Sequence, residues 1–308
     1  MIKNRFVLID SFALIHRAYH AIPILTTKDG VLVNAVYGFT SAILSAIKNL
    51  EPEYLACGMD MPKPTKRHAD YAEYKAHRAP LADELKSQIP YVKEVLKVFN
   101  IPIIGVQGYE GEDIIATIVA KSKAHASRQM PNDKNMEHVI VTGDMDTLQL
   151  VDAQTRVYSM ARGVNQAVMY DEKKVIERYG LGPAQFVDFK ALKGDQSDNI
   201  PGVTGIGEKT ACKLKQEYDN LENIYANLEK ITGKTQTLLK EQKDQAFMSR
   251  KLSKIVNDAP IDFNLESARI HDFDLESVTK LLIKLGFNSL VARLPHSDNK
   301  KLEQGKLL

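Results

Sequence analysis

The sequence lacks several features that would place it in a broad class of proteins. No apolar run approaches the roughly 20 residues that a membrane-spanning helix requires. Only two cysteines occur, Cys57 and Cys212, too few and too far apart for a disulfide framework or a zinc cluster. The N-terminus enters an apolar stretch without the small-residue cleavage site of a signal peptide. We therefore expect a protein of a reducing, cytoplasmic compartment whose cysteines are core thiols.

Patterns that would indicate histidine-based chemistry are also missing. His16, His20, His68 and His77 are not at the spacings of zinc motifs, and no nucleophile–histidine–acid arrangement is present. These absences leave the acidic residues without a competing candidate for a catalytic centre.

The net charge of +2 becomes informative when one group of acidic residues is set aside. Without the nine carboxylates discussed below, the chain carries 41 basic against 30 acidic side chains, a net charge of +11. A positive surface around a negative pocket suits a metal-dependent enzyme that acts on a polyphosphate. The alternative is a near-neutral surface with scattered charges.

The first 180 residues alternate strand and helix patterns, which predicts an α/β domain with a mostly parallel sheet, of the PIN-like or Rossmann-like kind. Apolar residues at helical spacing indicate a helix over 35–50. The predicted strands cover residues 6–10, 54–60, 101–104 and 138–142, with a hairpin formed by 156–160 and 167–170.

Two other segments differ from this pattern. Residues 62–90 are rich in proline, basic residues, histidine and tyrosine but poor in aliphatic side chains, so we expect them to project from the core. Residues 181–294 are mainly helical with glycine and proline breaks, which predicts a second, helical subdomain. Residues 133–137 are expected to form a surface loop, and the polar tail 295–308 is left without assigned structure.

Three predicted strands end in aspartates: Asp10, Asp60 and the pair Asp144 and Asp146. In an open α/β sheet, ligands bind at the carboxyl ends of the strands. We therefore expect these side chains to meet in one crevice. A single aspartate after a strand is more often a turn or cap residue, so the prediction depends on the whole set.

Two further acidic groups follow along the chain. Glu110, Glu112 and Asp113 stand where a helix is predicted to begin, a place that the helix dipole alone would favour. Asp195 and Asp198 are three residues apart, so they would face the same way on a helical turn.

Nine carboxylates in one pocket would repel each other by several kcal/mol per close pair. Without cations, several would have to protonate or the cluster would separate. Oxygen-only ligand sets suit Mg²⁺ or Mn²⁺, and there are more carboxylates here than one ion can use. Two ions about 3.5–4 Å apart are the usual arrangement for phosphodiester hydrolysis.

With these motifs identified, the sequence resembles the 5′ nuclease domain of bacterial DNA polymerase I and, more broadly, the flap endonuclease family. The resemblance is collinear over roughly residues 5–290. The segments that carry it are residues 8–10, 35–39, 67–68, 74–80, 108–110, 142–146, 192–203 and 205–211.

The resemblance implies that all nine carboxylates line a two-metal site. These are Asp10, Asp60, Glu110, Glu112, Asp113, Asp144, Asp146, Asp195 and Asp198. The family usually has an aspartate where this chain has Glu112, and more often an aromatic residue where it has Met59. The first change should adjust the metal geometry, and the second should affect packing.

The basic segment 62–90 fits the family's helical arch, which the 5′ single strand passes through or under. Lys75 and Arg78, on one face of a predicted helical turn, would reach the scissile phosphate and offset transition-state charge. Tyr74 would stack on a terminal base, and Arg67 and Arg17 would contact phosphates. The alternative is that residues 62–90 form a solvated basic loop without a role in binding.

Residues 201–211 have the pattern of a helix–hairpin–helix, which binds the DNA backbone rather than the bases. Gly202, Gly205 and Gly207 would let the backbone approach a phosphate at the start of the next helix, with Lys209 and Lys213 extending the contact. The resemblance implies a K⁺ ion in this loop. The alternative is a glycine-rich connection that binds nothing.

Together these features predict a structure-specific 5′-3′ exonuclease or flap endonuclease. We expect it to be a monomer that acts on 5′ flaps and on nicked or 5′-ended duplex DNA, in primer removal and repair. It would be either free-standing or linked to a DNA polymerase. The rival hypotheses are a PIN-like ribonuclease and a non-catalytic protein that binds branched DNA.

Overall fold

The computed structural model describes residues 4–62, 64–129, 136–270 and 273–294. The expectations for the first three residues, for most of the 133–137 loop and for the tail 295–308 fall outside these residues. Within the described residues, no helix is both long enough and apolar enough to cross a membrane.

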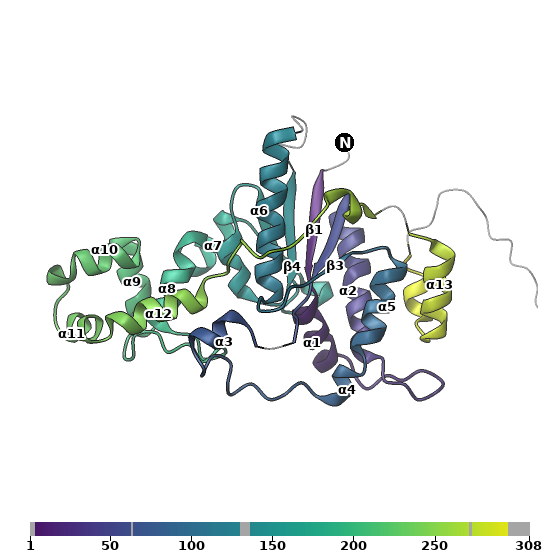
Figure 1. Ribbon diagram of the computed structural model, residues 1–308, viewed down its shortest axis with the longest axis horizontal. Helices are drawn as coiled ribbons and strands as arrows, with labels where there is room; N and C mark the ends of the chain where they lie inside the picture. The colour runs from purple at the N-terminus through teal and green to yellow at the C-terminus, as the bar shows by residue number, and fades with distance from the viewer. Residues whose placement is uncertain (1–3, 63, 130–135, 271–272, 295–308) are drawn as a thin grey trace, which may run out of the picture.

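A six-stranded sheet with the strand order β3-β2-β1-β4-β5-β6 forms the centre of the molecule (Figure 1). Its strands are β1 (Arg5–Asp10), β2 (Tyr54–Gly58), β3 (Ile103–Ile104), β4 (Glu137–Thr142), β5 (Thr155–Ser159) and β6 (Val168–Tyr170). All neighbouring pairs are parallel except β5 and β6, which form the antiparallel hairpin. The predicted fold class is confirmed.

Both faces of the sheet are buried, which explains why its central strands are continuous apolar runs. Along β1, Phe6 and Leu8 enter one hydrophobic cluster, and Val7 and Ile9 enter the other. Helices α1 (Ser11–Ala21), α2 (Asn34–Leu50) and α5 (Ile89–Val98) contribute to the second cluster, and α6 (Gly111–Gln129) contributes to the first. Because β1 and β4 are parallel, the turns that follow these two strands lie at the same edge of the sheet.

A helical region extends to one side of the sheet (Figure 1). Helix α7 (Glu172–Tyr179) follows β6, and the α-helices of this region are α8 (Phe186–Lys193), α9 (Glu208–Tyr218), α10 (Leu221–Ala226), α11 (Lys234–Glu241) and α12 (Lys243–Ser253). The short 3-10 helices of the described chain are η2 (Met145–Leu150), η3 (Val164–Gln166), η4 (Pro183–Gln185), η5 (Leu228–Lys230) and η6 (Leu265–Ala268). Cys57 is buried in the core as expected, whereas Cys212 on α9 is only half-buried.

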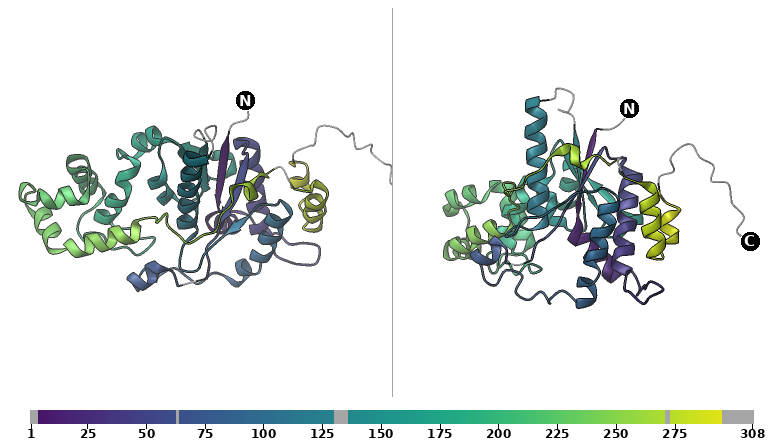
Figure 2. Two further views of the ribbon diagram at one scale, coloured as in Figure 1. Left: turned by 45° about the horizontal axis from the view of Figure 1, so that its top comes forward. Right: turned by 45° about the vertical axis from the view of Figure 1, so that its right-hand side comes forward.

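The last helices leave this region and return to the other side of the sheet. Helices α13 (Leu275–Lys284) and α14 (Asn288–Val291) lie beside α2 and α5, as Figure 2 shows. The Phe273 ring lies 5.3 Å from that of Phe99, and the Phe287 ring lies 5.3 Å from that of Tyr37. Residues 273–291, which fall within the predicted helical subdomain 181–294, therefore pack on the α/β core, and the subdomain boundaries stay a prediction.

The segment 62–90 does not project as a whole. It contains α3 (Lys66–Asp70) and α4 (Asp83–Lys86), joined by a stretch that runs along the lower edge of the molecule in Figure 1. Its C-terminal end is anchored by Gln88, which is fully buried. The Gln88 side chain accepts a hydrogen bond from the Ala35 backbone at 2.8 Å and donates one to Asn34 at 3.0 Å. The lack of aliphatic residues did not predict this anchoring, because the contacts are polar.

Candidate active site

Asp10 ends β1 and also caps the helix that follows it. One of its carboxylate oxygens accepts a hydrogen bond from the Ala13 backbone at 3.2 Å. The other accepts one at 2.6 Å from the hydroxyl of Thr142, the last residue of the neighbouring strand β4. Burial, with the negative charges of Asp60 and Asp144, raises the pKa of Asp10 to about 7. The Asp10 carboxyl is thus costly to ionise without a cation.

Asp60 follows β2, on the opposite side of β1 from β4. Its carboxylate accepts a hydrogen bond at 2.9 Å from the backbone of Gly111, the first residue of α6. Burial raises the pKa of Asp60, with Glu110 adding to the effect. The hydrogen bond joins the end of β2 to the acidic turn that precedes α6.

Asp144 and Asp146 lie in the turn after β4. The Asp144 carboxylate accepts a hydrogen bond from the Asp146 backbone at 2.9 Å. Burial and the charge of Asp144 raise the pKa of Asp146 to about 6. Asp144 also interacts electrostatically with Asp10 and Glu112, so it lies between the acidic groups from three parts of the chain.

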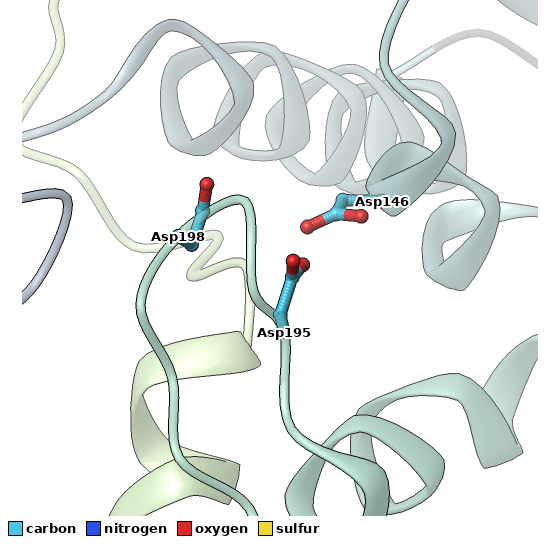
Figure 3. Close-up of side chains that lie close together, drawn as sticks. All are labelled: Asp146, Asp195 and Asp198. Carbon is cyan, nitrogen blue, oxygen red and sulfur yellow. The ribbon is translucent and has the colours of Figure 1, made fainter. Parts of the chain in front are cut away.

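Asp195 and Asp198 come from the turn between α8 and α9 and face Asp146 (Figure 3). One carboxylate oxygen from each of the three residues lies within 4.8 Å of those of the other two. The turn is not helical as predicted, since Asp195 pairs with Ile200 in a short antiparallel bridge. Even so, the turn brings together three carboxylates that could hold a metal ion.

Lys190 on α8 is a member of this site that sequence reasoning missed. Its ammonium group forms ion pairs with Asp146 and, at 2.6 Å, with Asp195. Burial alone would raise the pKa of Asp195, but Lys190 lowers it to about 2. The available signal was position, because Lys190 lies one helical turn before the Gly194 break that begins the acidic turn.

Glu110 and Glu112 line the site, whereas Asp113 points elsewhere. The two oxygens of the buried Asp113 accept hydrogen bonds from both terminal nitrogens of Arg67 at 2.8 Å. They also accept from the Glu110 backbone at 3.1 Å and the Val256 backbone at 3.0 Å. Arg67 thus binds both oxygens of Asp113 in this structure, and the metal-ligand role of Asp113 stays a prediction.

Arg67 is likewise not free to contact a phosphate. It is 7% exposed, and besides Asp113 it donates hydrogen bonds to the carbonyl oxygens of Leu252 at 3.0 Å and Lys254 at 2.9 Å. It thus ties α3 to α6 and to the segment after α12. Burial raises the pKa of Glu112 well above its usual range, and the charge of Glu110 adds to this rise, although the Arg67 guanidinium opposes it.

The ring of Tyr74 is buried, with 1% exposure, so it presents no open face to a base in this structure, and its stacking role stays a prediction. Its hydroxyl lies 3.2 Å from carboxylate oxygens of both Glu110 and Asp198. Burial and these two charges raise the pKa of Tyr74, which keeps the phenol protonated as a donor.

Lys75 and Arg78 lie against the same two acidic groups. The Lys75 ammonium is 2.7 Å from Glu110 and 3.5 Å from Asp198, and Arg78 pairs with Asp198. The chain around these residues is a series of turns rather than a helix, and Lys75 has a φ of 53°. The two residues therefore do not lie on one helical turn as predicted. Both cations nevertheless reach the carboxylates, as a role beside a phosphate requires.

The glycine loop between α8 and α9 is tightly folded. Gly202 has a φ of 62°, and a Cβ atom there would lie 2.2 Å from the Gly194 backbone nitrogen, so only glycine fits. Gly207 precedes α9 with no side chain capping the helix, and open space surrounds it. Gly205 has a φ of 96°. The loop therefore presents backbone at the start of α9, where an anion would be favoured.

The remaining predicted DNA contacts lie at the surface. Lys209 and Lys213 are exposed on α9. Arg17, on α1, donates a hydrogen bond to the carbonyl oxygen of Ala161. These three side chains stay predicted contacts.

The chain was compared with known proteins. The family described as 5′-3′ exonuclease, N-terminal resolvase-like domain, matches residues 5–180, and the 5′-3′ exonuclease C-terminal SAM fold matches residues 181–276. DNA polymerase I of Caldicellulosiruptor bescii is 42% identical over 96% of this chain and 34% of its own length. DNA polymerase I of Bacillus subtilis is 36% identical over 99% of this chain and again 34% of its length. The chain thus spans about a third of these relatives.

Solved structures with the same fold share less sequence. The T5 5′-exonuclease with bound zinc has a TM-score of 0.64 at 22% identity, covering 81% of this chain and 89% of its own. Flap endonuclease-1 from Methanococcus jannaschii has a TM-score of 0.58 at 16% identity, covering 95% of this chain and 91% of its own. These similarities show a shared architecture.

Proposed function

Because the chain belongs to the 5′-3′ exonuclease family, we propose that it hydrolyses phosphodiester bonds of DNA at a 5′ end or a 5′ flap, with divalent metal ions. One observation carries this proposal. Carboxylates from the ends of β1, β2 and β4 lie at the same edge of the sheet, and oxygens of Asp146, Asp195 and Asp198 lie within 4.8 Å of one another. Such oxygen-rich sites suit hard divalent cations.

The residues present fit two such ions. We assign one ion to the group around Asp144, which includes Asp10, Asp60, Glu110 and Glu112. The second belongs to Asp146, Asp195 and Asp198. The raised pKa of the buried Asp10 supports this assignment. Its carboxyl is costly to ionise on its own, and a bound cation would stabilise the ionised form. We propose Mg²⁺ or Mn²⁺ as the ions.

When bound, the two ions supply Lewis-acid stabilisation of the charge on the scissile phosphate. Lys75 and Arg78 add positive charge on the same side, and Lys75 is held against Glu110 at 2.7 Å until substrate arrives. The glycine loop before α9, with Lys209 and Lys213, binds the duplex backbone through exposed amides and cations, and K⁺ is a proposed ligand of this loop.

The proposed partners follow from this chemistry and from the relatives. The substrates are 5′ flaps and nicked or 5′-ended duplex DNA, and the protein acts as a monomer in primer removal and repair. The relatives are DNA polymerases, so a covalent or functional link to polymerase activity is part of the proposal. The low cysteine content supports a cytoplasmic setting.

We also propose the boundary near residue 180 between the nuclease core and the DNA-binding helices, with the 62–90 segment as the arch.

Cleavage of a 5′-labelled flap DNA with Mg²⁺ tests the proposed function. We expect short 5′ products with Mg²⁺ and none with EDTA. Preferred cleavage of single-stranded RNA would instead favour a PIN-like ribonuclease. Flap binding that persists in EDTA, with no cleavage under any divalent ion, would favour a non-catalytic DNA-binding protein.

The raised pKa values predict that metal binding depends on pH. A metal ion binds the ionised carboxylates, so protons must leave Asp10, whose pKa is about 7, and Asp146, whose pKa is about 6. We expect the Mg²⁺ affinity to fall from about pH 8 to about pH 6, by up to about tenfold per pH unit for each proton displaced.

Calorimetric titration in buffers of different ionisation enthalpy measures this proton release. Asp10→Asn is the informative variant, because it removes one titrating group and should reduce the pH dependence. Equal affinity at both pH values, with no protons released, would show that these carboxyls are already ionised without metal.

A further inference from the structure

Two histidines on α1 lie side by side outside the carboxylate site. His16 and His20 are four residues apart, so the helix places them on one face. Their Nε2 atoms are 3.3 Å apart, and their ring centroids are 4.5 Å apart with a T-shaped arrangement. Both side chains are exposed. Sequence analysis found no zinc spacing among the histidines, and it overlooked this pair.

The distance between the two nitrogens matches that of two ligands on one metal ion. A zinc–imidazole bond is about 2.0–2.1 Å, so neighbouring ligands of a tetrahedral ion are roughly 3.3–3.4 Å apart. Pairs of histidines four residues apart on a helix bind zinc in metalloproteases for the same geometric reason. The two rings therefore need little movement to share an ion.

We propose that His16 and His20 form a binding site for a borderline divalent transition metal, of the class Zn²⁺, Ni²⁺ or Cu²⁺. This class prefers imidazole, whereas the carboxylate site suits Mg²⁺ or Mn²⁺, so the two sites differ in selectivity. The exposure of both rings leaves room for water to complete the coordination sphere.

The electrostatic surroundings of His16 support this assignment. Imidazole binds a metal only when it is neutral. Burial, the neighbouring His20 and the cation Arg78 lower the pKa of His16, so this ring is neutral at physiological pH. Arg78 is itself paired with Asp198, which offsets its repulsion of a bound cation. Without metal, one ring donates an Nε2–H to the Nε2 of the other. When the ion binds, that proton moves by way of solvent to Nδ1 of the same ring, so both rings stay neutral and both Nε2 atoms are free to bind the ion.

Copper titration followed by electron paramagnetic resonance tests the proposal. The full chain is titrated with Cu²⁺ while excess Mg²⁺ occupies the carboxylates. We expect one Cu²⁺ signal with coupling to two imidazole nitrogens. His16→Gln and His20→Gln should each lose one nitrogen coupling. Because loss of an outer-shell partner already costs 10–100-fold, loss of a ligand should weaken binding by at least about 10-fold.

Two control variants separate this site from others. His77→Gln removes an exposed histidine outside the pair, and Asp146→Asn alters the carboxylate site; both should keep the two-nitrogen signal. Circular dichroism checks that each variant is folded. The proposal is overturned if the native chain shows no imidazole coupling, if His16→Gln and His20→Gln bind Cu²⁺ like the native chain, or if His77→Gln removes the signal equally. None of these outcomes depends on nuclease activity.

Discussion

Replacing Asp144 with asparagine is expected to lower kcat for flap cleavage by about 10³-fold, since a catalytic metal contributes several kcal/mol to transition-state stabilisation. Asp144 interacts electrostatically with Asp10, Glu112 and Asp146, so its charge is shared by both proposed ion positions. The amide oxygen of asparagine can still accept the hydrogen bond from the Asp146 backbone. The variant should therefore fold normally and lose only the charge.

Single-turnover cleavage of a 5′-labelled flap with Mg²⁺ measures this effect. Asp152→Asn is a matched control, because Asp152 also accepts a backbone hydrogen bond from the second residue after it, at 2.9 Å. It lies in the turn before β5, at the opposite edge of the sheet from Asp144. We expect cleavage by this control to match that of the native chain. Equal cleavage by the Asp144 variant would remove Asp144 from the metal site.

The sheet and its acidic edge could be predicted because both depend on local patterns. Strands buried on two faces are short apolar runs, and parallel strands carry their functional residues at their carboxyl ends. Asp10, Asp60 and Asp144 follow such runs, so their common edge followed from the strand order alone. The sequence pattern was less informative about side chains that reach the site from elsewhere in the chain.

Lys190 and Asp113 illustrate this limit. A lysine on a helix is usually solvated, and the position of Lys190 one turn before Gly194 does not by itself show that it faces Asp146 and Asp195. Asp113 has the residue type and position of a metal ligand, but Arg67 comes from 46 positions away to occupy its oxygens. Pairings over such distances depend on the tertiary fold, which periodicity does not encode.

The basic segment was misjudged for a related reason. A low content of aliphatic residues predicts that residues 62–90 bury little. Tyr74 and Arg67 are buried all the same, because Glu110, Asp113 and Asp198 provide hydrogen-bonding partners for them. Polar groups can be buried when their partners are buried with them. Composition alone cannot reveal that condition.

The basic side chains of the site offset part of the repulsion among the carboxylates, which the sequence pattern alone assigns to metal cations. In the structure, Lys75, Arg78 and Lys190 each pair with members of the cluster. Part of the negative charge is therefore offset by the chain itself. The proposed divalent ions must compete with these ammonium and guanidinium groups for the carboxylates. Lys75, Arg78 and Lys190 would therefore affect metal binding, in addition to any contact with the substrate.

Replacing Arg67 with alanine is expected to destabilise the fold by about 3–5 kcal/mol, because removing one partner of a buried ion pair leaves the other uncompensated. The side chains of Arg67 and Asp113 are 9% and 3% exposed, and two hydrogen bonds of 2.8 Å join them. The variant also frees the carbonyl oxygens of Leu252 and Lys254. Urea denaturation measures the change in the free energy of unfolding.

Two comparisons show whether the buried pair is responsible. Lys280→Ala breaks an exposed pair with Glu276 and should leave the urea midpoint nearly unchanged. The double variant Arg67→Leu with Asp113→Leu should be more stable than Arg67→Ala, since Asp113 no longer remains as a buried charge without its partner. Both variants equally lose the ion pairs of Arg67 with Glu110 and Glu112. If Arg67→Ala unfolds at the same urea concentration as Lys280→Ala, the Arg67–Asp113 pair does not hold the 62–90 segment against α6. Residues 62–90 would then have to be positioned by Tyr74 and Gln88 instead.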